Sequence, residues 1–169
     1  VYYCKDMLSD EARELLEDLR AAVAVGQLAV KMVELSPQLL RKAAYRESPD
    51  GILAVAPQQR RTLEDLVLGE SPFIMVLENV EKPGNRGAIL RTADGAGAHA
   101  VLLCGAGTDP FNPNVLRASR GAFFTVPTVA CDTTTVLEFC RERGLRTVAT
   151  SPEADGAWDA ADLKGGTAI

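Results

Sequence analysis

"NVEKPGNRGAILRTADGAGAHAVLLC", residues 79–104, contains the pattern that decides the fold of this 169-residue chain. An apolar run that begins at residue 73, before the quoted stretch, leads into a Pro-Gly-Asn turn. A segment with helical periodicity follows, and a second apolar run comes after it. The first run, "FIMVLENV" at 73–80, is nearly continuous, which is typical of a strand buried on both faces of a parallel sheet. Strand, helix and strand at this spacing indicate a βαβ unit with a right-handed crossover. The stretch therefore predicts an α/β fold built on a parallel sheet.

The same alternation of strand and helix continues on both sides of this stretch. Downstream we expect a helical turn, an extended piece, a helix and a strand, at 112–124, 125–130, 133–144 and 145–151. Upstream, Ser9 and Ser36 stand where helix N-caps are expected, and Pro37 follows the second of them. Residues 1–57 contain too few elements for a complete core, so we interpret them as part of a small α/β domain. Residues 58–70 are then a linker, and 71–169 are a second domain.

Composition and charge limit the classes of protein to which this chain can belong. Hydrophobic residues make up 47% of the chain and charged residues 24%, which is ordinary for an ordered α/β protein. No apolar run approaches the roughly 20 residues that cross a bilayer, so we expect no membrane association. The net charge of −5 disfavours broad, non-specific nucleic-acid binding, but a local arginine cluster can still bind RNA.

The cysteines and the histidine do not have the spacing of a metal site. They are Cys4, Cys104, Cys131, Cys140 and His99. No C-x-x-C pair is present, so we expect no metal, and thiols that stay reduced in the cytoplasm.

Three interpretations compete for the glycine-rich helix that follows the Pro-Gly-Asn turn. A P-loop requires a lysine after its glycines, and none follows here. A dinucleotide fingerprint requires its glycines at the start of the helix, whereas Gly95 and Gly97 fall at its end. The third interpretation is that the small residues leave one face of the helix bare, where another chain or a ligand can approach the backbone.

Arg91 rises from this bare face. At about 100° per residue, it shares the face with Gly87, Ala88, Asp94, Gly95 and Ala98, while Ile89, Ala93 and Ala96 point toward the sheet. The competing interpretation is a surface pair between Arg91 and Asp94. Asn85 is equally open, because asparagine commonly fills turns and N-caps.

A second group of polar residues follows in "NPNVLRASRGAFFTVP". Arg117, Ser119 and Arg120 lie in one turn before a glycine, where they could bind an anion or simply form a solvated basic turn. Thr150 ends a later strand, and the Asn85 turn follows the carboxyl end of the first strand. Because ligand sites of open parallel sheets gather at the carboxyl ends of strands, we expect these segments to lie near each other.

Together these segments resemble the SpoU branch of the SPOUT RNA methyltransferases. The likeness covers residues 71–169, and its first motif, P-G-N-x-G-A-I-x-R-T, is specific. The resemblance implies transfer of a methyl group from S-adenosylmethionine to a ribose 2′-hydroxyl of structured RNA, with rRNA favoured over tRNA. It implies a parallel-sheet α/β fold with a carboxyl-terminal trefoil knot, a homodimer and a cytoplasmic location. The preceding part is similar to the end of a ribosomal-protein-like RNA-binding domain.

The same resemblance suggests roles for individual residues. Arg91 and Asn85 take the catalytic positions of the first motif. The RNA-binding positions fall on Arg86, Arg117, Ser119 and Arg120. Thr150 matches a strand end that borders the cofactor.

One departure from the family pattern concerns its third motif, a Gly-Glu strand end followed by an Ile-Pro loop and a Ser-Leu-Asn helix. The chain stops at "GGTAI", where that strand should begin, so we expect the knot segments to be missing. The start at Val1 likewise suggests a fragment. A non-catalytic RNA-binding or assembly module on the same scaffold is therefore the alternative function, and a tRNA-directed methyltransferase is another. The sequence does not decide whether Arg91 is a base or an electrostatic stabiliser.

Overall fold

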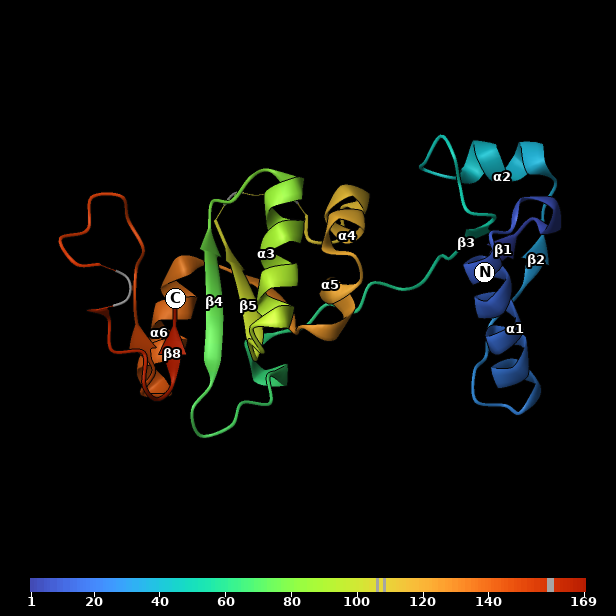
Figure 1. The fold of residues 1–169 in the computed structure, drawn as a ribbon. Coiled ribbons are helices and arrows are strands. Elements are labelled where there is room, and N and C mark those ends of the chain that lie inside the picture. The colour runs from blue at the N-terminus through green and yellow to red at the C-terminus, as the bar shows by residue number, and fades with distance from the viewer. Residues whose placement is uncertain (106, 108, 158–159) are drawn as a thin grey trace. The chain divides into compact units, whose positions relative to one another are not determined.

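The computed structural model describes residues 1–105, 107, 109–157 and 160–169. The chain divides into two compact units, Val1–Pro57 and Gln58–Ile169 (Figure 1). No helix in the described ranges is both long and apolar enough to span a bilayer.

The first unit is a small sheet with two helices. Its elements are β1 (Tyr2–Tyr3), the 3₁₀ helix η1 (Lys5–Met7), α1 (Asp10–Ala24), β2 (Val33–Glu34), α2 (Pro37–Ala43) and β3 (Ile52–Leu53). β1 is the central strand, parallel to β2 and antiparallel to β3. Both predicted helix starts are confirmed, because Ser9 Oγ accepts from Ala12 N at 3.2 Å and Ser36 Oγ accepts from Leu39 N at 3.4 Å.

The second unit contains the parallel sheet that the sequence predicted. Its elements are η2 (Leu63–Asp65), β4 (Phe73–Glu78), α3 (Pro83–Gly95), β5 (Ala100–Cys104), α4 (Pro113–Ser119), α5 (Ala122–Thr125), β6 (Thr128–Cys131), α6 (Thr133–Glu142), β7 (Arg146–Thr147) and β8 (Thr167–Ala168). Among the described residues five strands form one sheet, all parallel, in the order β6-β5-β4-β8-β7. The α/β parallel-sheet prediction is therefore confirmed.

The two faces of this sheet bury two separate cores. Alternate side chains along β5 point to opposite faces, so Leu102 joins one core and Leu103 the other. Helices α3, α4 and α5 cover one face, and α6 covers the other (Figure 1). Leu63 and Leu66 are buried in the core beneath α6, so part of the segment predicted as a linker packs into the second unit.

The carboxyl ends of the strands define the edge where a ligand site is expected. β4 lies between β5 and β8, so the chain order reverses beside it. β7 covers Arg146–Thr147 and is shorter than the strand predicted at 145–151, although Val148 N still donates to Ala168 O at 2.9 Å. Thr150 consequently lies beyond the strand, in the loop that leaves the sheet.

Candidate active site

Gly87 is the point at which α3 and α4 meet. A Cβ atom at this position would lie 2.4 Å from Ala118 Cβ and 2.8 Å from Ser119 N, closer than real Cβ contacts. Only glycine therefore allows the α4 backbone to approach this closely. The sequence predicted a bare face open to another chain or to a ligand. At Gly87 that prediction was wrong, because α4 of the same chain covers the face.

The predicted orientation of α3 is correct within the helix and fails beyond its end. Ala93 is buried and Ile89 packs against the core, as expected. Ala96, predicted to face the sheet, is exposed, and Ala98, predicted on the bare face, is buried. The chain turns at Gly97, whose φ is +68°, so helical periodicity no longer decides which way these side chains point.

Arg91 is held by the end of α4. Its Nη1 donates a hydrogen bond to the carbonyl oxygen of Ala118, next to the predicted basic turn. The competing interpretation, a pair with Asp94, is not formed, because Asp94 Oδ1 instead accepts from Thr125 Oγ1 at 2.8 Å. No other described residue bonds the Arg91 guanidinium, and its side chain is exposed. The remaining nitrogens of a fork with five N–H donors can therefore bind a ligand.

Asn85 lies in the first turn of α3 and does not cap it. The N-cap residue is Lys82, whose carbonyl accepts from Asn85 N at 3.0 Å. The side chain of Asn85 is exposed, and no described residue bonds it. Its amide is thus available to a ligand at the carboxyl side of β4.

Arg86 differs from the other predicted RNA-binding residues because it is buried. Its side chain is 3% exposed, and Nε donates to Val80 O at 2.5 Å. A Cβ at Gly107 would overlap Arg86 Nη2, so the loop after β5 closes directly over the guanidinium. Burial lowers the pKa of Arg86. This placement argues against a direct RNA contact and for a role in holding the loops after β4 and β5.

Ser119 is also placed inside the fold. It is 0% exposed, and its hydroxyl donates to Leu116 O at 2.7 Å and accepts from Phe123 N at 3.4 Å. The hydroxyl therefore joins the end of α4 to α5. As a direct RNA contact the prediction for Ser119 is not supported by this position, which suits a structural role.

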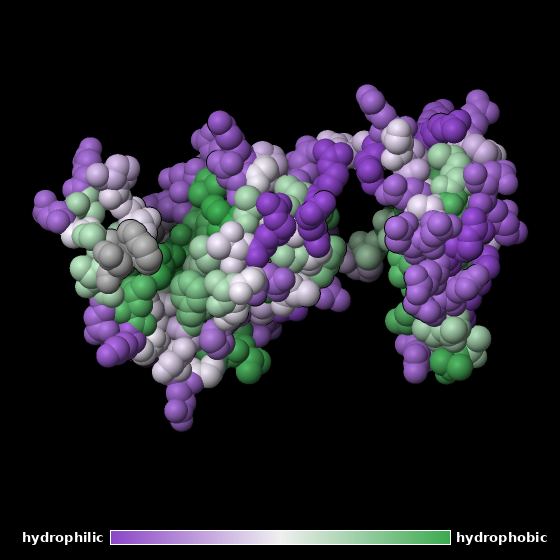
Figure 2. Space-filling view, viewed as in Figure 1, coloured by the Kyte–Doolittle hydropathy of each residue, from purple (hydrophilic) through white to green (hydrophobic). Residues whose placement is uncertain are grey.

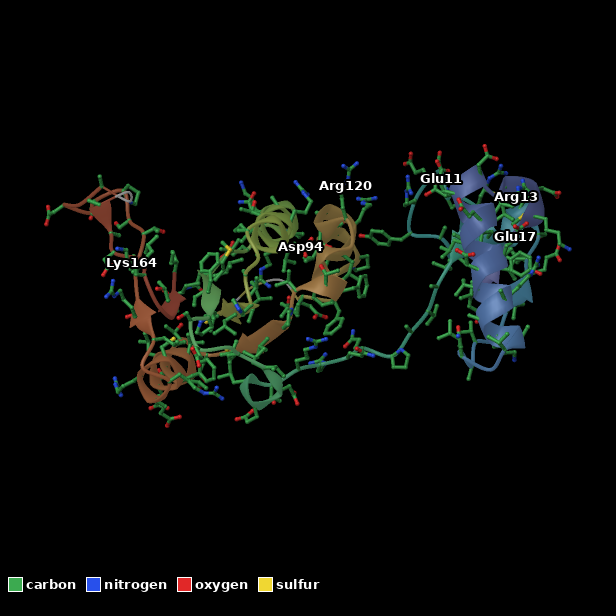
Figure 3. The ribbon with its side chains drawn as sticks, turned by 60° about the horizontal axis from the view of Figure 1, so that its bottom comes forward. Glu11, Arg13, Glu17, Asp94, Arg120 and Lys164 are labelled. Atoms are coloured by element: carbon green, nitrogen blue, oxygen red, sulfur yellow. The ribbon has the colours of Figure 1, made fainter. Side chains whose placement is uncertain are left out.

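The two arginines of the predicted basic turn are exposed. Arg117 Nη2 donates to Asn114 Oδ1 at 3.1 Å, and Arg120 adopts the left-handed conformation with φ of 51°. Gly121 follows with φ of 97°, so the chain reverses between α4 and α5. The side chain of Arg120 extends away from the helices (Figure 3). Both guanidinium groups are thus accessible to a phosphate group that approaches from solvent.

A cavity of about 710 Å³ opens beyond the carboxyl ends of β7 and β8. It is lined by Val148, Ala149, Thr150, Ser151, Pro152, Ala154, Gly156, Ala157, Ala160, Ala161, Leu163 and Ile169. Hydrophobic residues gather between this loop and the sheet, where the C terminus lies (Figure 2). The volume is within the range of small-molecule sites, and the position is the one expected for ligands of open parallel sheets. Thr150 and Ser151 are the hydroxyl residues of its wall.

The arrangement brings some predicted residues together and not others. Arg91 bonds the carbonyl of Ala118, next to Arg117 in the last turn of α4, whereas no described contact links Thr150 to either arginine. The sequence missed the contribution of Gly87 and of the Ala118 carbonyl. Gly87 is recognisable in the sequence as a small residue on one face of the helix, but the pattern does not indicate which segment covers it. Within the described ranges, no three His, Cys, Asp or Glu residues are grouped as metal ligands.

Comparison with known proteins identifies a family. The sequence pattern of the SpoU rRNA Methylase family matches residues 72–169. A 23S rRNA (guanosine-2′-O-)-methyltransferase from Ralstonia nicotianae is 33% identical over 162 residues, which cover 93% of this chain and 64% of that protein. A 23S rRNA (uridine(2479)-2′-O)-methyltransferase from Streptomyces viridochromogenes is 30% identical over 123 residues, or 72% of this chain and 40% of the relative.

Solved structures have the same fold. A crystal structure of an RNA 2′-O ribose methyltransferase matches 99% of this chain and 61% of that chain, with a TM-score of 0.78 and 33% identity. An AdoMet-bound rRNA methyltransferase from Sinorhizobium meliloti matches 99% of this chain and 60% of that chain, with a TM-score of 0.82 and 26% identity. The chain therefore spans less than two thirds of the length of these relatives.

Proposed function

Because the chain belongs to the SpoU rRNA methylase family, we propose that it is an RNA methyltransferase. It transfers a methyl group from S-adenosylmethionine to a ribose 2′-hydroxyl of structured RNA. The observation that carries the proposal is Arg91, an exposed arginine whose Nη1 donates to the carbonyl of Ala118, the residue that follows the exposed Arg117. The relatives named above act on 23S rRNA, which supports rRNA over tRNA as the substrate class.

The cavity fits a nucleoside-sized cofactor. Its wall consists mainly of small apolar residues, and Thr150 and Ser151 add hydroxyl groups that could bind polar atoms of the ligand. S-adenosylmethionine bound there would supply an electrophilic methyl group to the ribose oxygen, and a neutral thioether and the proton of the hydroxyl would be released. An AdoMet-bound structure among the similar proteins supports this assignment of the cofactor.

Arg91 suits electrostatic stabilisation better than proton removal. A guanidinium normally stays protonated in proteins, so it is a poor base. Its bond to Ala118 fixes the plane of the group, and the remaining N–H donors can bind the phosphate beside the reacting ribose and stabilise the developing alkoxide. Asn85, also exposed on α3, can orient the RNA through its amide.

The remaining features of the proposal concern partners and location. The first unit is part of an RNA-binding domain, and its last helix carries Arg41 and Lys42 in its final turn. We propose that the protein works as a cytoplasmic homodimer, without metal and without a membrane. The family resemblance supports the dimer and its location.

Calorimetric titration of the full-length protein with S-adenosylmethionine tests this function, and we expect micromolar binding. Thr150→Val should weaken binding about 5- to 10-fold through loss of one hydrogen bond. The matched control is Thr134→Val, the same change on the exposed surface of α6, which should bind normally. If the full-length protein does not bind the cofactor, the enzyme proposal is wrong and the non-catalytic RNA-binding module becomes the assignment.

A further inference from the structure

Three phenylalanine rings form a row at the α4–α5 side of the second unit. The ring centroids of Phe111 and Phe123 are 5.2 Å apart, and those of Phe123 and Phe124 are 5.5 Å apart, both in edge-to-face geometry. Phe123 packs against the hydrophobic core, which anchors the row. Phe124 lies at the outer end of the row and is 73% exposed. The row thus presents one aromatic ring to solvent on a rigid support.

The segments that form this row are locally cationic. Gln58–Thr62 and Pro110–Thr125 contain Arg60, Arg61, Arg117 and Arg120, in a chain whose net charge is −5. Two carboxylates bond the ends of the longer segment: Asp109 accepts from Phe111 N at 3.0 Å and Asp94 accepts from Thr125 Oγ1 at 2.8 Å, so the arginines outnumber the carboxylates. Arg60 lies over the Phe111 ring, with its guanidinium carbon 5.8 Å from the ring centroid. Its Nε and Nη2 both donate to Gln58 Oε1, at 3.3 and 3.0 Å, so this cation is positioned beside the rings.

We propose that Phe124 is a stacking site for an unpaired nucleobase of the RNA, with Arg60, at the Phe111 end of the row, and the exposed Arg120 binding phosphates of the adjoining backbone. This inference rests on RNA being the substrate. Proteins that bind single-stranded RNA combine an exposed aromatic ring, on which a base stacks, with arginines that follow the backbone. The row supplies both in one surface. A methyltransferase acting on a ribose within structured RNA could use such a site to hold a neighbouring base out of its stack.

Charge distinguishes RNA from a second copy of this chain as the occupant. In a two-fold symmetric dimer the same patch lies on both sides of the interface. Four arginines and the two carboxylates that bond the longer segment would then face the same groups, so the positive charge on each side would exceed the negative charge, which is unfavourable. The phosphates of RNA provide the opposite charge.

The test uses Phe124→Leu, which keeps apolar volume but removes the aromatic face. Because Phe124 is largely exposed, the variant should fold normally. The probe is a single-stranded oligoribonucleotide with one 2-aminopurine, whose fluorescence falls when it stacks on an aromatic ring. We expect Phe124→Leu to bind this probe about 5- to 100-fold more weakly and to lose the quenching. Phe124→Trp should restore both.

Two controls separate stacking from general effects. Leu137→Ala removes another exposed apolar side chain, on α6, and should leave binding and quenching unchanged. A duplex of the same sequence should bind wild type and Phe124→Leu equally, because its bases are already stacked. Wild-type binding and quenching by Phe124→Leu would overturn the proposal. So would a change in the sedimentation mass of the free Phe124→Leu protein, since it would show an interface between copies.

The test of the stacking site gives a result that is independent of the test of the methyltransferase proposal. If wild type binds no S-adenosylmethionine but quenches the probe through Phe124, the stacking site stands and the methyltransferase proposal falls. If wild type methylates RNA and Phe124→Leu binds the probe as wild type does, only the stacking site is wrong.

Discussion

Replacing Gly87 by alanine should displace the helix that holds Arg91. The added Cβ would lie 2.4 Å from Ala118 Cβ and 2.6 Å from the Ala118 carbonyl carbon, whereas ordinary contacts begin at 3.4 Å. The neighbouring atom is backbone and cannot rotate away, so α4 must move by about 1 Å. The Ala118 carbonyl, which accepts the hydrogen bond from Arg91, moves with it.

The expected loss of stability follows from two opposing effects. Inserting a methyl group into a packed contact typically costs about 1–3 kcal/mol. The change from glycine to alanine within a helix returns up to about 1 kcal/mol through backbone entropy. Gly95→Ala is the matched control, because it lies on the same helix and nothing is within 4 Å of its added Cβ. The difference in unfolding free energy between the two variants should therefore be about 1–3 kcal/mol.

Two measurements follow from this displacement. Urea unfolding monitored by circular dichroism gives the free energy of unfolding. Single-turnover methylation with saturating RNA and cofactor reports on the chemistry. Misplacing a reacting group by 1 Å can cost about 100-fold in rate, so Gly87→Ala should be slow while Gly95→Ala is not.

Cofactor affinity provides the internal check. The described residues that line the cavity include none from α3 or α4, so Gly87→Ala should bind S-adenosylmethionine as wild type does. The reasoning would be refuted if Gly87→Ala matched Gly95→Ala in both unfolding and methylation rate. A parallel loss of cofactor binding would show general disruption instead of displacement of Arg91.

Three further outcomes are expected from the same geometry. Arg91→Lys should lose most single-turnover activity, because a compact ammonium does not reproduce the planar fork, and near-normal rates would remove Arg91 from the mechanism. Alanine at Arg117 and Arg120 should weaken RNA binding more at low salt than at high salt, measured by anisotropy, and a loss independent of salt would indicate a structural role. Burial and the neighbouring Cys104 raise the pKa of Cys131 to about 12. This pKa exceeds that of the unfolded chain, so the thiol loses its proton more easily when the protein is unfolded. The contribution of Cys131 to the free energy of unfolding is therefore complete below about pH 9 and is lost as the pH rises toward 12. Cys131→Ala should accordingly unfold with a weaker dependence on pH in that window, and an identical dependence would contradict the shift.

The sequence predicted the sheet well because its signals are local. The continuous apolar run that became β4 has no competing interpretation once a helix and a second run follow it. The caps of α1 and α2 depend on residues within one turn and are found as expected. Strand order is not local. The insertion of β8 between β4 and β7 depends on pairing between residues far apart in the chain, which periodicity does not contain.

The site was predicted less completely because its geometry depends on which segments pack together. Arg86 and Ser119 read as surface polar residues, yet loops and helices distant in sequence bury both. A buried arginine needs hydrogen-bond acceptors, and Arg86 uses the Val80 carbonyl. The residues next to Arg86 in the sequence do not predict that acceptor. Arg91 bonds the end of α4 and does not stand on a bare helix face, and its catalytic role stays a prediction.

The last turn of α4 explains why an arginine stands at position 91. The final carbonyls of a helix lack partners within it. Here Leu116 O accepts from the Ser119 hydroxyl, and Arg117 O accepts from the backbone of Arg120. Ala118 O is left for a donor from outside the helix, and Arg91 supplies it through one nitrogen. A lysine could bind that carbonyl as a point charge, but only the planar guanidinium can do so and still aim fixed N–H donors outward. The residue that completes α4 therefore also keeps N–H donors available at the exposed surface, where we propose that RNA binds.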